Sequence, residues 1–344
     1  IPSEHFNTVL YTGNGNTANN GNVITGVGFQ PDFLWVKNRN GGNVHSLQDA
    51  VRGVRGVLQS QTTEGENATR GYINSFTADG FNTGNANGAS INPSNGSGLT
   101  YVAWNWKANG SGSSNTNGSI TSTVSANTDA GFSIVSYTGV VASSGTIGHG
   151  LSKAPEMIIL KRRSNTDPWE VLHHGIASDY ETDILVLQDT DAAGDLSTIW
   201  NDTKPTPSVF SVGSSNNVNG TDDTYIAYCF HSVDGYSKVG SYTGNGSTDG
   251  TFVYTGFRPA WIMIKKSSGS ESWWMVDNKR RTYNPQEFGL QANSSDDELG
   301  VSKPLDIVSN GFKSRKATGY HNDSGATYIY IAFAETPFKY SNAK

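Results

Sequence analysis

Three short apolar stretches of the chain share one pattern and predict β-strands. Residues 100–106, 224–230 and 327–333 each open on Thr-Tyr and continue with aromatic, β-branched and small residues. In the first stretch, Val102 and Trp104 fall on one face, and the residue between them falls on the other. Successive side chains of a strand point to opposite faces of a sheet, so this alternation is typical of a strand.

Two further signatures precede each of these stretches, always in the same order. Tyr-Thr-Gly begins at positions 11, 137 and 242, and a proline at 31, 155 or 259 opens an apolar run that ends in lysine. The spacing agrees, because 124 residues separate Pro31 from Pro155 and also Thr100 from Thr224. Ordered signatures at matching offsets indicate internal repeats. We therefore predict three homologous units, at residues 1–107, 131–231 and 235–344.

Turn residues are frequent between the predicted strands. The chain has 40 glycines, and Asn-Gly pairs such as 14–15 and 245–246 supply the positive φ that tight hairpin turns require. Units of about 100 residues with short strands and many turns are typical of small antiparallel sandwiches. The predicted fold is all-β, with three tandem antiparallel β-sandwich units of the jelly-roll or lectin-like type.

The junctions between the predicted units differ in length. Residues 108–130 are rich in Gly, Ser, Asn and Thr, which is typical of a flexible linker because little apolar surface can be buried. The alternative is an extended strap that docks on a neighbour by strand addition. Only residues 232–234 join the second and third units, so these should pack rigidly. Residues 47–61 are equally consistent with a short helix or an arginine-bearing loop.

Charge and composition exclude several classes of protein. The net charge of −6 and the pI of about 5.6 argue against a general nucleic-acid binder. No stretch approaches the ~20 apolar residues of a membrane-spanning helix. Cys229 is the only cysteine, which excludes an internal disulfide and a cysteine zinc cluster. Its apolar neighbours predict that it is buried.

Motifs that would indicate an enzyme or a metal site are missing from the sequence. There is no Gly-x-Ser-x-Gly elbow and no phosphate-binding loop. The only histidine cluster is His173 and His174, which on a strand would point to opposite faces, one packed and one exposed; metal binding or base catalysis is the alternative. Acidic residues 222–223 and 296–298 are interpreted as solvated turns, with weak calcium sites as the alternative. We predict no catalytic residue, cofactor or metal.

Aromatic and basic residues gather at corresponding places of the predicted units and form the candidate recognition surface. An exposed tryptophan beside polar groups can stack on a sugar or form the centre of a protein interface. The alternative is that these residues pack within their own unit. Of Trp273 and Trp274, we expect one in the core and one facing outward. The candidate residues are Trp169, His173, His174, Trp273, Trp274, Asp277, Arg280, Arg281 and Arg52.

The signatures resemble a family of repeat-containing virion proteins encoded by tailed bacteriophages, many from marine and other environmental samples. The resemblance is carried by residues 3–15, 26–32, 101–108, 242–259 and 332–340, and covers nearly the whole chain. The family is a domain of unknown function, so it supplies no catalytic residues. It implies a virion structural protein, such as a tail fibre, a spike or a capsid decoration.

The expected function is therefore that of a non-enzymatic bacteriophage structural protein on the particle surface. We expect it to self-associate as a homo-oligomer, with a trimer the most plausible form, and to contact other virion proteins and a host-surface glycan. One alternative is a carbohydrate-binding module of a secreted or surface protein. Another is a subunit of an extracellular filament that assembles by strand exchange. An enzyme would require a compact carboxylate pair in a cleft.

Overall fold

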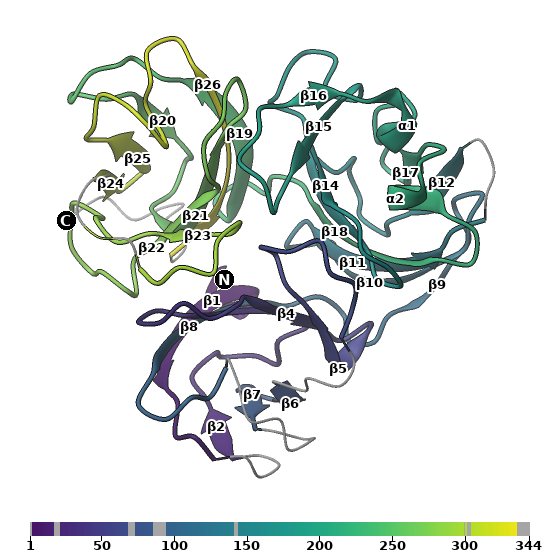
Figure 1. Ribbon diagram of the computed structural model, residues 1–344, viewed down its shortest axis with the longest axis horizontal. Helices are drawn as coiled ribbons and strands as arrows, with labels where there is room; N and C mark the ends of the chain where they lie inside the picture. Colours follow the sequence, from purple (N-terminus) through teal and green to yellow (C-terminus); the bar gives the residue numbers. More distant parts are fainter. Residues whose placement is uncertain are drawn as a thin grey trace.

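The computed structural model describes residues 2–16, 21–67, 73–84, 94–140, 144–298, 300 and 304–335. Strands dominate these ranges, which confirms the all-β prediction (Figure 1). The helices among the described residues are short: η1 (Pro2–Glu4), α1 (Ser197–Trp200) and α2 (Asn216–Asn219). None of them is long and apolar enough to cross a membrane.

The names first, second and third unit are kept below for residues 1–107, 131–231 and 235–344. The described part of the first contains a large and a small antiparallel sheet. The large sheet has the order β1-β8-β3-β4-β5 and the small one β2-β7-β6. Ile24, Ile73 and Phe81 of the small sheet pack against Leu34 and Tyr101 of the large one. The small sheet therefore covers one face of the large sheet. The strands are β1 (Phe6–Thr12), β2 (Asn22–Ile24), β3 (Phe33–Asn38), β4 (Ser46–Asp49), β5 (Gly53–Leu58), β6 (Ile73–Thr77), β7 (Gly80–Thr83) and β8 (Thr100–Trp106).

The second unit has a larger main sheet, because the preceding segment contributes to it. Its order is β16-β15-β14-β13-β18-β11-β10-β9, and β12 pairs with β17 in a two-stranded sheet. Ile147 and Phe210 of the small sheet belong to one buried cluster with Leu160 and Tyr225 of the large one. The strands are β9 (Ser113–Asn115), β10 (Ser122–Asn127), β11 (Phe132–Thr138), β12 (Gly145–Gly148), β13 (Met157–Arg162), β14 (Trp169–His173), β15 (Asp183–Val186), β16 (Gly194–Asp195), β17 (Val209–Val212) and β18 (Thr224–Phe230).

The third unit has the same strand order as the first. Its large sheet is β19-β26-β21-β22-β23 and its small sheet is β20-β25-β24. Val253 and Phe312 of the small sheet pack with Ile264 and Tyr328 of the large one. The strands are β19 (Ser237–Thr243), β20 (Phe252–Tyr254), β21 (Pro259–Lys266), β22 (Trp274–Asp277), β23 (Leu290–Gln291), β24 (Leu305–Val308), β25 (Gly311–Ser314) and β26 (Thr327–Ala334).

The sequence signatures meet one another in the structure. The tyrosine of each Tyr-Thr-Gly signature stacks on the tyrosine of the Thr-Tyr signature paired with it, with ring centroids 4.9, 5.0 and 5.2 Å apart. The glycine of the signature is required because a Cβ on Gly13, Gly139 or Gly244 would lie 2.2 Å from a backbone carbonyl oxygen. The same local packing therefore explains the signature in each unit.

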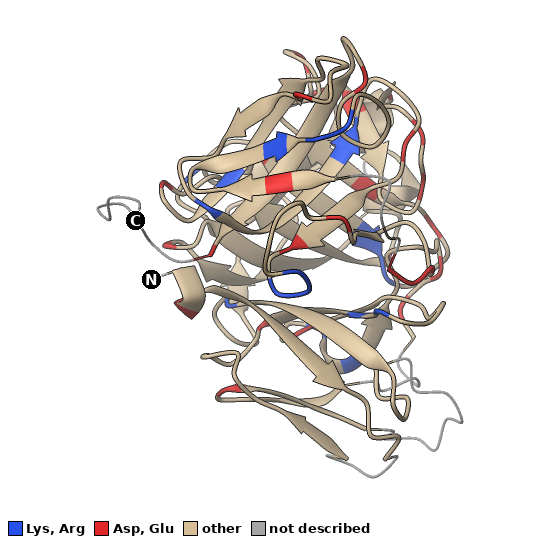
Figure 2. Cartoon of the chain, turned by 90° about the vertical axis from the view of Figure 1, so that its left-hand side faces the viewer, with Lys and Arg blue, Asp and Glu red and all other residues tan. Residues whose placement is uncertain are grey.

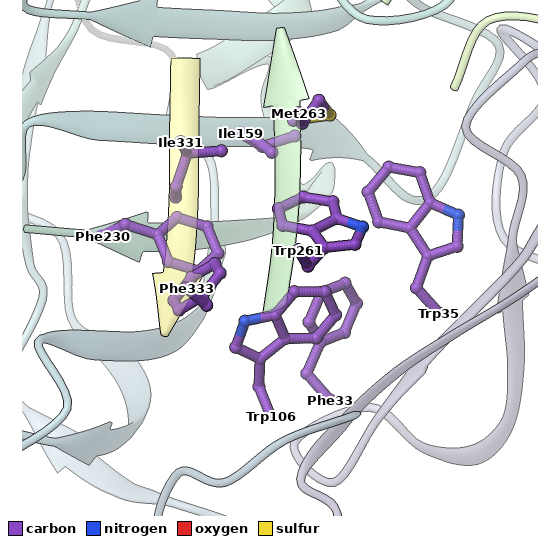
Figure 3. Close-up of a pocket in the computed structure, with 9 residues that line it drawn as sticks. All are labelled: Phe33, Trp35, Trp106, Ile159, Phe230, Trp261, Met263, Ile331 and Phe333. Atoms are coloured by element: carbon purple, nitrogen blue, oxygen red, sulfur yellow. The ribbon is translucent and has the colours of Figure 1, made fainter. Parts of the chain in front are cut away.

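The three large sheets turn their other faces toward one another and share a single core (Figures 1 and 3). Trp106, Phe230 and Phe333, at the same place of the three Thr-Tyr strands, all belong to it. Trp106 and Phe230 each contact Phe333, with ring centroids 5.7 and 6.1 Å apart. The rings leave a cavity of only about 10 Å³, room for at most one water molecule. The units are thus joined through a common interior, in addition to any core of their own.

The junction at residues 108–130 differs from a free linker. Strand β10 pairs with β11 over six residues, from Ser122 opposite Tyr137 to Asn127 opposite Phe132, and β9 pairs with β10. Backbone pairing does not need apolar side chains, which explains how such a polar segment enters a sheet. Residues 47–61 are neither a helix nor a loop alone, because they lie largely in the β4–β5 hairpin.

Candidate functional site

The predicted recognition residues lie mostly inside the molecule, at the boundaries between units. Trp169, Trp273 and Trp274 are each at most 1% exposed. Trp273 faces the shared core and Trp274 faces the core under the third unit's small sheet. The expectation of an outward tryptophan is wrong, because both faces of these large sheets are covered. Cys229 is buried as predicted.

An aromatic residue eight positions after each signature lysine makes a hydrogen bond across a boundary through its ring nitrogen. Trp169 Nε1 donates to Gln59 O of the first unit at 3.0 Å, and Trp273 Nε1 donates to Val186 O of the second unit at 2.9 Å. His45 stands at the same place of the first unit, and its Nε2 lies 3.0 Å from Gln291 O of the third. Burial lowers the pKa of His45 to about 3, so the ring is neutral. The three contacts therefore join the second unit to the first, the third to the second, and the first to the third, so that the units form a closed ring.

The lysine that ends each proline signature makes a second contact of the same kind. Lys37 Nζ donates to Ser295 O of the third unit, Lys161 to Thr63 O of the first and Lys265 to Thr190 O of the second, at 3.0–3.2 Å. All three lysines are fully buried. Burial lowers the pKa of each to about 8. The sequence carried the signal for these contacts, a lysine at the same place in three copies.

Arg52 and Arg280, two of the predicted residues, form equivalent buried ion pairs. Arg52 Nε lies 2.5 Å from Asp49 Oδ2, and the second unit's Tyr228 hydroxyl donates to the same oxygen at 2.8 Å. The Asp49 carboxylate, together with Tyr228 and Glu66, keeps the pKa of Arg52 raised despite the opposing effect of burial.

In the third unit, Arg280 Nε lies 2.5 Å from Asp277 Oδ2, to which Trp104 Nε1 of the first unit donates at 3.2 Å. Arg280 also lies over the Trp104 ring, 5.7 Å from its centroid. Asp277 is thereby assigned to a boundary and not to the surface.

A glutamate extends each of these ion pairs to a second arginine across the boundary. Glu66 lies 3.3 Å from Arg52 Nη1 and 2.6 Å from Arg163 Nε of the second unit. Burial would raise the pKa of Glu66, but the two arginines hold it below its usual value. The third unit repeats the arrangement, since Glu298 lies 2.7 Å from Arg39 Nε and 3.4 Å from Arg280 Nη1.

The boundary between the second and third units keeps the backbone contacts but replaces these charges. The N–H of Ala193 donates to Ser267 O at 2.8 Å, as the N–H of Glu66 does to Arg163 O at 2.7 Å. His173 stands in the place of Asp49, and its Nε2 lies 3.1 Å from Tyr330 O. Burial lowers the pKa of His173 to about 3, so this group is also neutral. His174 is half-buried, with Nε2 3.3 Å from Val239 O.

Two other predicted features, Arg281 and the acidic turns, also have polar partners. Arg281 lies 2.8 Å from Glu287 and stacks 4.4 Å from the ring of Tyr283, which is 65% exposed. Of the acidic turns, Asp223 accepts from Arg162 at 2.5 Å, and Glu298 takes part in the boundary described above. Within the described ranges, no group of three or more His, Cys, Asp or Glu residues is arranged to hold a metal.

A polar cavity lies between the first and third units and was not predicted. Its volume is about 200 Å³. Thr8 Oγ1 and Asn278 Oδ1 are buried and have no hydrogen-bond partner. The one sequence signal is the residue after the signature proline, which is Asp32, Glu156 or Ala260 in the three units. The cavity is lined by Ser3, Phe6, Asn7, Thr8, Ala260, Asn278, Lys279, Ala334 and Glu335.

Charged side chains of both signs are interspersed on the side of the molecule seen in Figure 2.

No curated protein matches this chain, and no solved structure does. A family model matches residues 1–337, which is nearly the whole chain. The chain therefore belongs to the family described as the domain of unknown function DUF7483.

Proposed function

We propose that this protein is a non-enzymatic structural component on the surface of a tailed bacteriophage particle, as a tail fibre, a spike or a capsid decoration. The proposal rests on one observation: the side chains that could take part in chemistry form contacts between the units. The buried lysines, the Arg52 and Arg280 ion pairs and His45 all hold one unit to the next. A molecule whose parts are joined by buried polar contacts in this way suits a structural component of an assembly, and the resemblance of the sequence to virion proteins supports its place in a particle.

The proposal includes three homologous units, each a β-sandwich. The recurring signatures, the stacked tyrosine pairs and the identical strand order of the first and third units support it. Because the three units already surround one core, a body of threefold shape exists within a single chain. It fits a threefold position in a particle as a monomer, and self-association would build on it.

The proposal is tested on purified particles of a phage whose genome encodes this chain. Mass spectrometry should find the chain at a stoichiometric level, and gold-labelled antibodies should mark one site on intact particles. A chain that is abundant in the lysate but absent from banded particles would contradict the proposal. Light scattering over a range of concentrations measures the mass of the isolated protein against the 36.8 kDa of one chain.

Glycan binding is a second candidate function, and one exposed aromatic pair favours it. Phe252 and Tyr254 point to the same side of the edge strand β20 and are 46% and 65% exposed. Lys313, paired opposite Phe252, lies 2.5 Å from Asp249 and supplies polar groups beside the rings. Aromatic faces flanked by polar groups suit sugar rings.

A glycan array on the intact protein tests this candidate, with Tyr254→Ala as the variant and Tyr283→Ala as the control. Both residues are 65% exposed, so loss of a signal with the first alone would place the sugar on β20. Equal signals from both variants would exclude it.

A further inference from the structure

Strands β1, β11 and β19 each pair on one side with a Thr-Tyr strand. The backbone groups on their other side, called outward here, are covered differently in the three units. In the third unit, the N–H of Val239 donates to Ser232 Oγ at 3.0 Å, and its carbonyl lies 3.3 Å from His174 Nε2. In the second unit, the equivalent Ile134 lies opposite Ser125 of β10, which pairs along the whole edge. Both edges are therefore occupied, one by side chains and one by a strand.

The equivalent edge of β1 in the first unit has no partner strand. β1 ends its sheet, and Thr8 takes the place of Val239 and Ile134, because it lies opposite Trp104 as they lie opposite Ile331 and Tyr228. The N–H of Thr8 bonds only to Asn7 Oδ1 at 2.9 Å. In the part of the chain that the structure describes, no strand pairs with this edge, and the carbonyl of Thr8 and the backbone groups of Leu10 have no hydrogen-bond partner. Such an edge is a template for strand addition.

The polar cavity lies beside this edge, at the place where the other two units have a carboxylate. Asp32 accepts the N–H of Ala108 at 2.7 Å, and Glu156 accepts the N–H of Ser232 at 2.7 Å, so each anchors the chain that crosses to the next unit. The third unit has Ala260 at that place, and the cavity remains. Two polar side chains that are more than nine-tenths buried, Thr8 and Asn278, line it with unpartnered oxygens. Buried polar atoms without partners are costly, so they point to a ligand that would satisfy them.

We propose that the edge of β1 and this cavity receive an extended segment of another protein, added as an antiparallel strand. The pairing of β10 with β11 in the same molecule shows the geometry. The segment carries a small side chain opposite Thr8 and a hydrogen-bond donor toward Asn278 Oδ1. Thr8 is only 5% exposed but lines the cavity, so a single strand that enters the cavity reaches it, whereas the edge of a second folded copy does not.

The experiment uses the intact protein and a fluorescent peptide with the sequence of residues 119–129, which contains β10. Fluorescence anisotropy measures binding, and a photoreactive group at the position of Ser125 records where the peptide lies. Leu10→Pro removes an outward N–H, and Ala260→Glu restores the carboxylate found in the second unit. Val23→Thr is the control, because Val23 is 59% exposed on β2 of the same unit.

We expect saturable binding that each test variant weakens at least tenfold and the control leaves unchanged, with the cross-link near Thr8 or Asn278. The melting temperature of each variant shows whether it folds. If Leu10→Pro does not fold, the binding measured with Ala260→Glu tests the proposal. Absence of saturable binding, or equal binding to wild type and Ala260→Glu, would overturn the proposal. So would a concentration-dependent doubling of mass that Leu10→Pro abolishes, because the occupant would then be a second copy. None of these outcomes depends on whether the protein belongs to a particle.

Discussion

Glu170 is a buried carboxyl group of β14 that accepts from Asn217 Nδ2 at 2.8 Å through one oxygen, while its other oxygen has no partner. Burial raises its pKa from 4.5 to about 7. The folded protein therefore holds a proton that the unfolded chain loses. The stabilisation from this proton is complete below pH 4.5 and is lost as the pH rises through 7.

Glu170→Gln should remove this dependence on pH, because the amide keeps an oxygen for Asn217 and never ionises. Relative to wild type, we expect the free energy of unfolding of the variant to rise by about 3 kcal/mol between pH 4.5 and pH 8. Urea unfolding at several pH values measures the difference. A constant difference between the two proteins would show that Glu170 ionises normally.

Arg52 is the second residue with a large expected effect, because its side chain is fully buried with Asp49. Arg52→Ile copies the residue found at the uncharged boundary, Ile176, but leaves Asp49 without its counter-charge. We expect a loss of about 3–5 kcal/mol in the free energy of unfolding, measured in urea. Lys313→Met is the matched control, since its partner Asp249 is exposed and loss of such a surface pair should leave the free energy of unfolding nearly unchanged. Adding Asp49→Asn to Arg52→Ile should recover part of the loss.

At the scale of elements, the glycine that follows the first signature strand is closely confined by a backbone carbonyl of a neighbouring loop. A Cβ on Gly139, which follows β11, would lie 2.2 Å from Gly220 O, whereas a Cβ on Gly194 in β16 would meet no atom within 4 Å. Gly139→Ala should therefore lower the melting temperature, with a cost of about 1–3 kcal/mol from overpacking. Gly194→Ala should leave it nearly unchanged. Equal melting temperatures for the two variants would contradict this account of the signature.

The elements also show how far the sequence could be interpreted. The strands at 100–106, 224–230 and 327–333 were predicted because alternation and recurrence are local properties. Strand β10 was missed because its pairing uses backbone groups, which the Ser- and Thr-rich sequence does not display. Trp169, Trp273 and Trp274 were identified as candidates for surface recognition, with packing inside their own unit as the alternative, since a single strand does not reveal that both sides of its sheet are covered. The cavity depended on Ala260, whose meaning appears only beside Asp32 and Glu156.

At the scale of the whole molecule, two neutral histidines at the boundaries between units make the stability of the folded protein sensitive to acid. His45 and His173 lie at different boundaries, and burial lowers the pKa of both from 6.5 to about 3. The unfolded chain gains protons below pH 6.5 that the folded chain resists, so stability is complete above pH 6.5 and falls as the pH approaches 3.

His173→Gln should weaken this acid dependence, because glutamine can still donate to Tyr330 O without accepting a proton. We expect the loss of stability below pH 6.5 to shrink by about 1.4 kcal/mol for each pH unit. Thermal unfolding from pH 7 to pH 4 measures it. A variant whose melting temperature falls as steeply as that of wild type would show that His173 does not contribute.

The cavity between the first and third units has a consequence for how the chain can be rewired. Ser3 and Glu335 line the same cavity, so the two ends of the described chain lie at the boundary between the first and third units. The other two boundaries are crossed by the polypeptide itself. A gene that joins these ends through a short linker and opens the chain at residues 232–234 should therefore encode the same body. Its circular dichroism spectrum should match that of the parent. Each of the three boundaries between units is then a place at which the chain can begin and end without a change of fold.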